Sequence, residues 1–200
     1  MMDRNFDASK LPEHAFGYHS LTWWGTAGYI AVEGAFFAVL VATYLYGMGR
    51  VPDWPPGAVE PLPRLWGTVS MVILLVSVVP NMLYKRAALR QDATGSRRWL
   101  LVAAVLGVIF LGVRVLEFSV INVKWTDHFY GSIVWLIFGV HTIHFLADFI
   151  ECVVLALLVF RRPLDVKRFS DLVDDALYWY FVIAVWVVLY VLLYLVPRWV

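Results

Sequence analysis

The chain has 200 residues, of which 62% are hydrophobic and 16% are charged, and its formal net charge at pH 7 is +1. A soluble domain of this length needs more charge to cover its surface, so the composition indicates an integral membrane protein. The nearly neutral net charge argues against nucleic acid as a partner.

Residues 1–20 form a polar N-terminal tail without the apolar stretch of a signal peptide, so we expect the first hydrophobic run to be retained. A helix needs about 20 apolar residues to cross a hydrocarbon core of about 30 Å. Residues 21–200 therefore predict one all-α domain, a bundle of five transmembrane helices near 21–47, 65–85, 98–121, 131–160 and 173–196.

Lysine and arginine predict the orientation of this bundle. The tail and the connections after the second and fourth runs carry 11 of these residues, whereas the connections on the other side and the C-terminal end carry 4. Because positively charged connections stay in the cytoplasm, we expect the N-terminus inside and the C-terminus outside.

The first run carries Glu33 near its middle. A carboxylate at that depth costs roughly 2.5–3.5 kcal/mol on insertion scales, so it needs a polar partner. Counting the helical rise from the predicted span ends puts His144 of the fourth run at a similar depth. We expect Glu33 to contact His144, and a structure with Glu33 out of reach of the fourth run would refute this pairing.

The third run carries Arg114 and Glu117, which are three residues apart and can pair on one face of a helix. The predicted depth of Glu117 matches that of His141 in the fourth run. We therefore expect a second contact between helices, from Glu117 to His141.

The fourth run contains His141, His144, Asp148 and Glu151, whose spacing of three, four and three residues forms one polar stripe. Lipid offers no hydrogen bonds, so we expect this stripe to face protein. A bis-histidine haem needs ligands from different helices, whereas His141 and His144 share one helix. A mononuclear metal site of His141, His144 and Asp148 is geometrically possible. We favour a hydrogen-bonded seam that fixes helix packing, with no catalytic site and no cofactor on this chain.

The last run begins with aromatic residues that follow two acids. Asp174 and Asp175 are interpreted as acids at a helix start, where they interact favourably with the helix dipole. The rings of Tyr178, Trp179 and Tyr180 are interpreted as belonging to the headgroup level of the membrane.

Several motifs occur in one order along the chain. They are Glu33-x-x-Phe36-Phe37, then Gly107-x-x-Phe110 with Arg114-x-x-Glu117-Phe118, then Asp127-x-x-Tyr130-Gly131-Ser132 with Gly139-x-His141-x-x-His144, and lastly Tyr178-Trp179 with Trp186. In their order and spacing they resemble subunit III of the haem–copper cytochrome oxidases. The resemblance runs from about residue 21 onward and corresponds to the last five of the seven helices found in the longer family members.

Four positions depart from the family pattern. Arg114 stands where glutamine is usual, Asp148 where glycine is usual, Tyr180 where histidine is usual, and Ile183 where aspartate is usual. The last helix has thus lost a polar group while the fourth has gained one. The chain resembles a diverged, short five-helix branch, in which Asp148 and Glu151 take over part of the polar network.

The resemblance implies a non-catalytic accessory subunit of a terminal oxidase in aerobic respiration. It would pack with catalytic subunit I and subunit II in the bacterial cytoplasmic membrane, bind phospholipid and support proton uptake, while the partner subunits hold haem and copper. A neighbouring subunit or lipid would complete a cleft that lacks the first two family helices. Two alternatives stay open: an accessory subunit of a nitric oxide reductase, and a small membrane metal or haem protein that uses His141 and His144.

Overall fold

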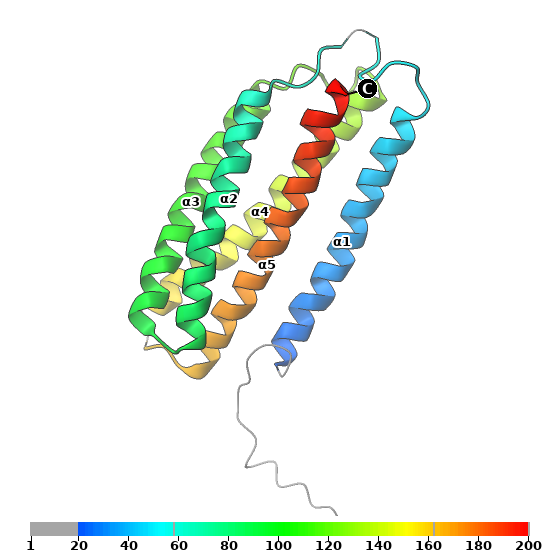
Figure 1. Ribbon diagram of the computed structural model, residues 1–200. Helices are drawn as coiled ribbons and strands as arrows, with labels where there is room; N and C mark the ends of the chain where they lie inside the picture. Colours follow the sequence, from blue (N-terminus) through cyan, green and yellow to red (C-terminus); the bar gives the residue numbers. More distant parts are fainter. Residues whose placement is uncertain (1–19, 58, 162, 200) are drawn as a thin grey trace, which may run out of the picture.

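The computed structural model describes residues 20–57, 59–161 and 163–199, and most of the predicted tail of residues 1–20 lies outside these ranges. The described part is helical and contains no strand. Its five long helices are each apolar enough to cross a membrane (Figure 1). Their bounds are α1 Leu21–Met48, α2 Arg64–Leu89, α3 Ala93–Ser119, α4 Phe129–Arg161 and α5 Val166–Tyr190.

The chain ends in two short irregular turns that prolong α5. Val191–Leu195 is a π-helical turn, η3, and Val196–Arg198 is a 3₁₀ turn, η4. The wider π turn contains Tyr194, which is 2% exposed and turns back toward the bundle.

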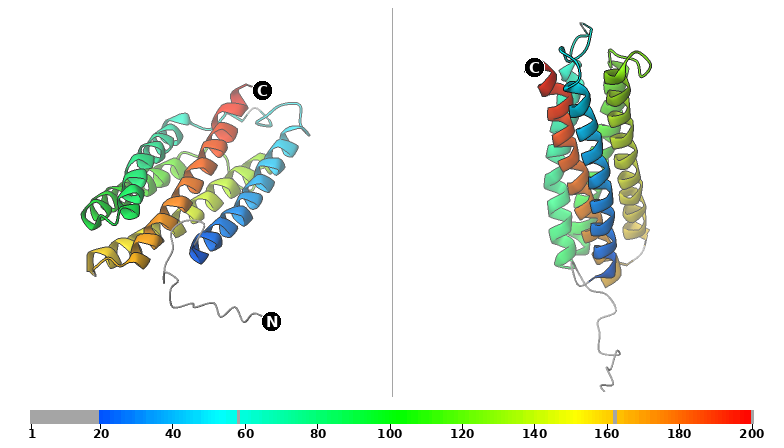
Figure 2. Two further views of the ribbon diagram at one scale, coloured as in Figure 1. Left: turned by 60° about the horizontal axis from the view of Figure 1, so that its bottom comes forward. Right: turned by 90° about the vertical axis from the view of Figure 1, so that its right-hand side faces the viewer.

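α5 lies at the centre of the bundle and packs against α1, α2 and α4. α2 and α3 form one side of the molecule, and α1 packs along α4 and α5 at the other side (Figure 2). The start of α1 and the α2–α3 and α4–α5 connections lie at one end of the bundle, and the other two connections and η4 lie at the opposite end (Figure 1). The connections rich in lysine and arginine therefore share one end, as the predicted topology requires.

Two helices begin earlier than their hydrophobic runs, because aspartates cap them. Asp92 accepts hydrogen bonds from the backbone N–H groups of Thr94 and Gly95, at 3.1 and 3.0 Å, and α3 begins at Ala93. Asp165 accepts one from the N–H of Arg168 at 2.9 Å, and α5 begins at Val166. A capping side chain satisfies N–H groups that a helix end leaves unpaired, so polar residues can join the first turns.

Glycines allow close contact between helices at three places. A Cβ at Gly67 of α2 would overlap the Tyr194 ring, one at Gly107 of α3 would overlap Phe149, and one at Gly47 of α1 would overlap Phe129. Small residues at helix interfaces are a common device of membrane bundles, because lipid provides little force for helix association and close packing must supply it.

Candidate functional site

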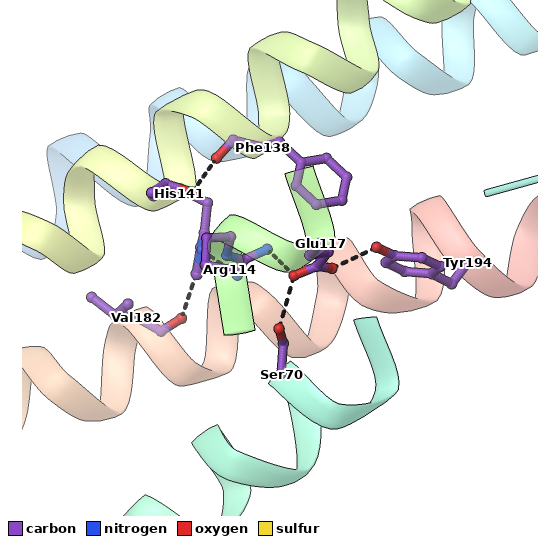
Figure 3. Close-up of polar contacts among 8 residues, drawn as sticks. Ser70, Arg114, Glu117, Phe138, His141, Val182 and Tyr194 are labelled. Atoms are coloured by element: carbon purple, nitrogen blue, oxygen red, sulfur yellow. Dashed lines mark hydrogen bonds and ion pairs between the residues drawn. The ribbon is translucent and has the colours of Figure 1, made fainter. Parts of the chain in front are cut away.

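A buried carboxylate, Glu117 near the end of α3, is the centre of a polar network that joins α2, α3, α4, α5 and η3 (Figure 3). The Arg114 guanidinium and the Ser70 hydroxyl both donate to Oε2 of Glu117 at 2.8 Å. The Tyr194 hydroxyl donates to Oε1 at 2.5 Å. Three donors from α2, α3 and η3 thus meet one carboxylate, so its bonds hold these segments in a single arrangement.

His141 of α4 extends this network to α5. Its Nε2 lies 3.2 Å from the carbonyl oxygen of Val182, and its Nδ1 lies 3.4 Å from Nη2 of Arg114 (Figure 3). A carbonyl only accepts and a guanidinium only donates. The ring is therefore neutral, with its proton on Nε2, since a proton on Nδ1 would face another donor.

Aromatic rings surround the Arg114 charge. Its guanidinium carbon lies 3.8 Å from the centroid of the Trp186 ring, 4.7 Å from Phe110 and 5.5 Å from Phe138. Arg114 is only 1% exposed. The negative faces of aromatic rings attract a cation, and this attraction is strongest where water is excluded. The Glu117 carboxylate and these rings together compensate for removing the charge from water.

A second polar cluster joins α1 to α4 and α5. Glu33 Oε1 lies 3.0 Å from His144 Nε2, the contact that the matched depths predict. The Tyr178 hydroxyl donates to Glu33 Oε2 at 2.5 Å. His144 Nδ1 donates to the carbonyl of Val140 at 2.7 Å, so one proton must lie between the His144 and Glu33 atoms. The pair is neutral overall, whichever group holds that proton.

The expected direct contact between Glu117 and His141 is replaced by a bridge. Arg114 lies between them, bound to Glu117 on one side and to His141 on the other. The long arginine side chain reaches past its own helical turn, so two residues of matching depth are joined through a third.

The polar stripe of α4 does not face protein along its whole length. His141 and Asp148 are buried and His144 is half-buried, whereas Glu151 is exposed. The expectation that all four residues are enclosed is therefore wrong for Glu151. Asp148 is 2% exposed, and neither of its carboxylate oxygens has a hydrogen-bond partner among the described residues.

The aromatic start of the last run is also more buried than the sequence suggested. α5 begins at Val166, so Asp174 and Asp175 lie within the helix and not in its first turn, and both are buried. Tyr178 holds Glu33 and Trp179 is 1% exposed, its Nε1 donating to the Ser77 hydroxyl at 3.0 Å. Asp174 and Asp175 are therefore not acids of the first helical turn, and Tyr178 and Trp179 point into the protein and not toward lipid.

The remaining motif positions shape helix ends and packing. Phe37 is buried with its ring 5.0 Å from that of His144, whereas Phe36 is 45% exposed. Before α4, the Asp127 carboxylate accepts from the N–H of Lys124 at 2.9 Å. At the start of α4, the Ser132 hydroxyl donates to the carbonyl of Trp125 at 2.6 Å.

Tyr130 and Gly131 complete this helix start. Tyr130 is fully buried, with its ring 5.0 Å from that of Trp54 in the α1–α2 connection. A Cβ at Gly131 would overlap the backbone carbonyl of Lys124, so a larger residue would push the connection away from α4.

The possible metal ligands of α4 point to different partners. His141 contacts α3 and α5, His144 contacts α1, and Asp148 lines a separate cavity. No group of three histidine, cysteine, aspartate or glutamate side chains in the described part of the chain is arranged to hold a metal ion.

Sequence reasoning missed three residues of these networks: Ser70, Tyr178 and Tyr194. Each donates a hydroxyl hydrogen bond to a buried glutamate. An acid within an apolar run needs hydrogen-bond donors. A systematic search for hydroxyl residues at the depths of Glu33 and Glu117 would therefore have found candidate donors.

Comparison with known proteins identifies the chain's relatives. Residues 9–198 match the sequence profile of the family described as cytochrome c oxidase subunit III. The chain belongs to the cytochrome c oxidase subunit III family. It is therefore an accessory subunit of a haem–copper oxidase and forms a complex with other oxidase subunits.

Three curated relatives of the subunit III family show the extent of the likeness. Cytochrome c oxidase subunit 3 of Synechocystis is 28% identical over 97% of this chain and 85% of its own length. That of Corynebacterium diphtheriae is 31% identical over 86% of both chains. That of Neurospora crassa is 28% identical, but the match covers only 61% of its length. With its five apolar helices and bacterial relatives, the chain is an integral protein of the bacterial inner membrane.

Proposed function

We propose that this chain stabilises the catalytic subunit of an oxygen-reducing terminal oxidase, binds phospholipid and supports sustained proton uptake during aerobic respiration. Catalytic subunit I and subunit II are its proposed partners, and they would hold the haem and copper. The observation that carries the proposal is that the buried polar groups pair within the chain. Glu33 pairs with His144, and Arg114 pairs with both Glu117 and His141. Groups that bind one another fix the helix arrangement, and such a rigid bundle suits a subunit that supports a neighbour.

Apolar grooves on the bundle support the lipid-binding part of the proposal. One groove of about 410 Å³ lies between α1 and α5 and is bounded by residues such as Gly34, Ala38, Val185 and Val188. Another of about 370 Å³ lies between α3 and α4, between Val105 and Val153. Grooves of this size and lining suit acyl chains, and a neighbouring subunit would cover whichever face it packs on.

The test compares the purified oxidase complex with and without this chain. We expect the complex that lacks the chain to keep its haem spectra and initial oxygen consumption, but to lose activity faster during turnover and to take up protons more slowly in vesicles. Adding the purified chain back should restore both rates.

Two outcomes would contradict the proposal. One is a haem spectrum or a stoichiometric metal on the isolated chain. The other is co-purification from mild detergent with no oxidase catalytic subunit, for instance with a nitric oxide reductase. Equal proton uptake with and without the chain would refute that part of the function alone.

A further inference from the structure

A cavity of about 340 Å³ lies between α1, α4 and α5, away from the network around Glu117. Its lining contains four carboxyl side chains and two tyrosines: Asp148, Glu151, Asp174, Asp175, Tyr29 and Tyr178. The rings of the two tyrosines stack with their centroids 5.6 Å apart. The cavity volume lies at the lower end of the range for small-molecule sites.

Four buried carboxylate oxygens in this cavity lack a hydrogen-bond donor among the described residues. Both oxygens of Asp148, which is 2% exposed, and one oxygen each of Asp174 and Asp175 are buried without a partner among the described residues. The remaining Asp174 oxygen accepts from Thr22 and that of Asp175 accepts from Tyr84, both at 2.7 Å. A buried acceptor without a donor is costly, so this lining suits a ligand that carries several donors and a positive charge.

The arrangement of the acids favours an organic cation over a metal ion. The described residues provide no group of three histidine, cysteine, aspartate or glutamate side chains placed to hold a metal. A primary ammonium group carries one positive charge and three N–H donors, as the lysine side chain does. It could donate to several of the unpaired oxygens of Asp148, Asp174 and Asp175 together.

The depth of the cavity points to a lipid headgroup as the source of this ammonium. α1 has 28 residues and α4 has 33, which gives lengths of about 42 and 50 Å, so their ends extend beyond a hydrocarbon core of about 30 Å. Gly25 lies one turn from the start of α1, and Gly25, Tyr29 and Glu151 at the rim of the cavity are exposed. The rim of the cavity is thus open on the helices' outer surface toward the headgroups, and Asp148 lies deeper, about one turn of α4 from His144.

We infer that this cavity binds the ammonium group of an ethanolamine phospholipid in preference to choline and glycerol headgroups. Choline is a quaternary ammonium without N–H donors, so it would leave the oxygens of Asp148 unpaired. A glycerol headgroup lacks the cation, so its lipid brings a net negative charge toward four carboxyl groups. This inference deepens the lipid-binding part of the proposed function and rests on it.

The test measures which lipids the purified oxidase complex retains. The complex is reconstituted in nanodiscs with equal amounts of phosphatidylethanolamine, phosphatidylcholine and phosphatidylglycerol, and then washed in lipid-free detergent. Mass spectrometry of the retained lipids should show phosphatidylethanolamine enriched several-fold, and retention should fall stepwise as the amine is methylated. Excess free ethanolamine should displace little of it, whereas full displacement would overturn a lipid as the occupant.

Two kinds of variant connect the enrichment to this cavity. Asp148→Asn combined with Asp175→Asn removes the acids' charge while keeping their shape. Gly25→Leu fills the rim of the cavity, and Gly28→Leu is its matched control: a Cβ meets no atom within 4 Å at either glycine, but only Gly25 lines the cavity. We expect the double variant and Gly25→Leu to lose the enrichment and Gly28→Leu to keep it.

The outcomes separate this inference from the proposed function. Retention of phospholipid without preference for ethanolamine would overturn the inference and leave lipid binding intact. An enrichment that survives in both Gly25→Leu and the double variant would place the ammonium elsewhere and also overturn it. Loss of all phospholipid from the unaltered complex would refute the lipid-binding function itself. If the double variant fails to assemble, the comparison of Gly25→Leu with Gly28→Leu still decides whether this cavity causes the enrichment.

Discussion

Arg114 is the residue on which most of the central network depends. It links Glu117 of its own helix to His141 of α4, and its charge lies over the Trp186 ring. A single hydrogen bond within a membrane bundle contributes about 0.6 kcal/mol on average. Removing one partner of a buried ion pair costs about 3–5 kcal/mol, because the other charge is left alone. The ion pair therefore outweighs the individual hydrogen bonds around it.

Replacing Arg114 should show that losing the ion pair costs more than losing a single hydrogen bond. We expect Arg114→Leu to lower the free energy of unfolding in detergent by about 3–5 kcal/mol, because Glu117 would keep only its hydroxyl donors. Arg114→Gln, which restores the residue usual in the family, should cost less than half as much, since its amide still donates. Adding Glu117→Gln to Arg114→Leu should recover part of the loss. Equal losses for leucine and glutamine would show that the charge does not matter.

Depth along a helix could be predicted from the sequence, but rotation about the helix and side-chain reach could not. The rise per residue placed Glu33 level with His144, and the two are in contact. The same count could not show that Arg114 would reach between Glu117 and His141. It also could not show that Tyr178 turns inward, because a tyrosine near a span end is as typical of the headgroup level as of a buried hydrogen bond.

At the scale of helices, the fold could be predicted in number and class but not in its boundaries. Five apolar runs became five helices, since the length of a span follows from the thickness of the bilayer. Hydropathy does not register a helix start that is capped by aspartate and continues through polar residues. α5 therefore extends from Val166, and its acids at 174 and 175 lie inside the bundle.

Close packing between α2 and η3 depends on the absence of a side chain at Gly67. We expect Gly67→Ala to displace the Tyr194 ring, weaken the Tyr194–Glu117 hydrogen bond, and destabilise the chain by about 1–3 kcal/mol. Gly112→Ala in α3 is the control: its Cβ would meet no atom within 4 Å, and alanine favours helix more than glycine does. Unfolding in detergent measures both. A neutral Gly67→Ala would show that η3 can shift without cost.

At the scale of the whole molecule, the topology in the membrane stays a prediction from charge that chemical labelling can test. Cys152 is the single cysteine and is buried, so Cys152→Ser gives a cysteine-free background in which single engineered cysteines can be labelled. In intact cells a membrane-impermeant maleimide should label Asp53→Cys in the α1–α2 connection. Thr94→Cys, near the α2–α3 turn, should be labelled only after permeabilisation. The reverse pattern would place the N-terminus outside.

The contact between Glu33 and Tyr178 also has a consequence for the synthesis and membrane insertion of this protein. The two residues are 145 positions apart. At about 5–20 residues per second, translation from one to the other takes roughly 7–30 s. Throughout that interval the nascent first helix carries an acid whose tyrosine donor has not yet been made, and His144 is synthesised only late in it. We therefore expect the first helix to stay incompletely paired until α5 is inserted, and slow codons between the two positions would prolong that state.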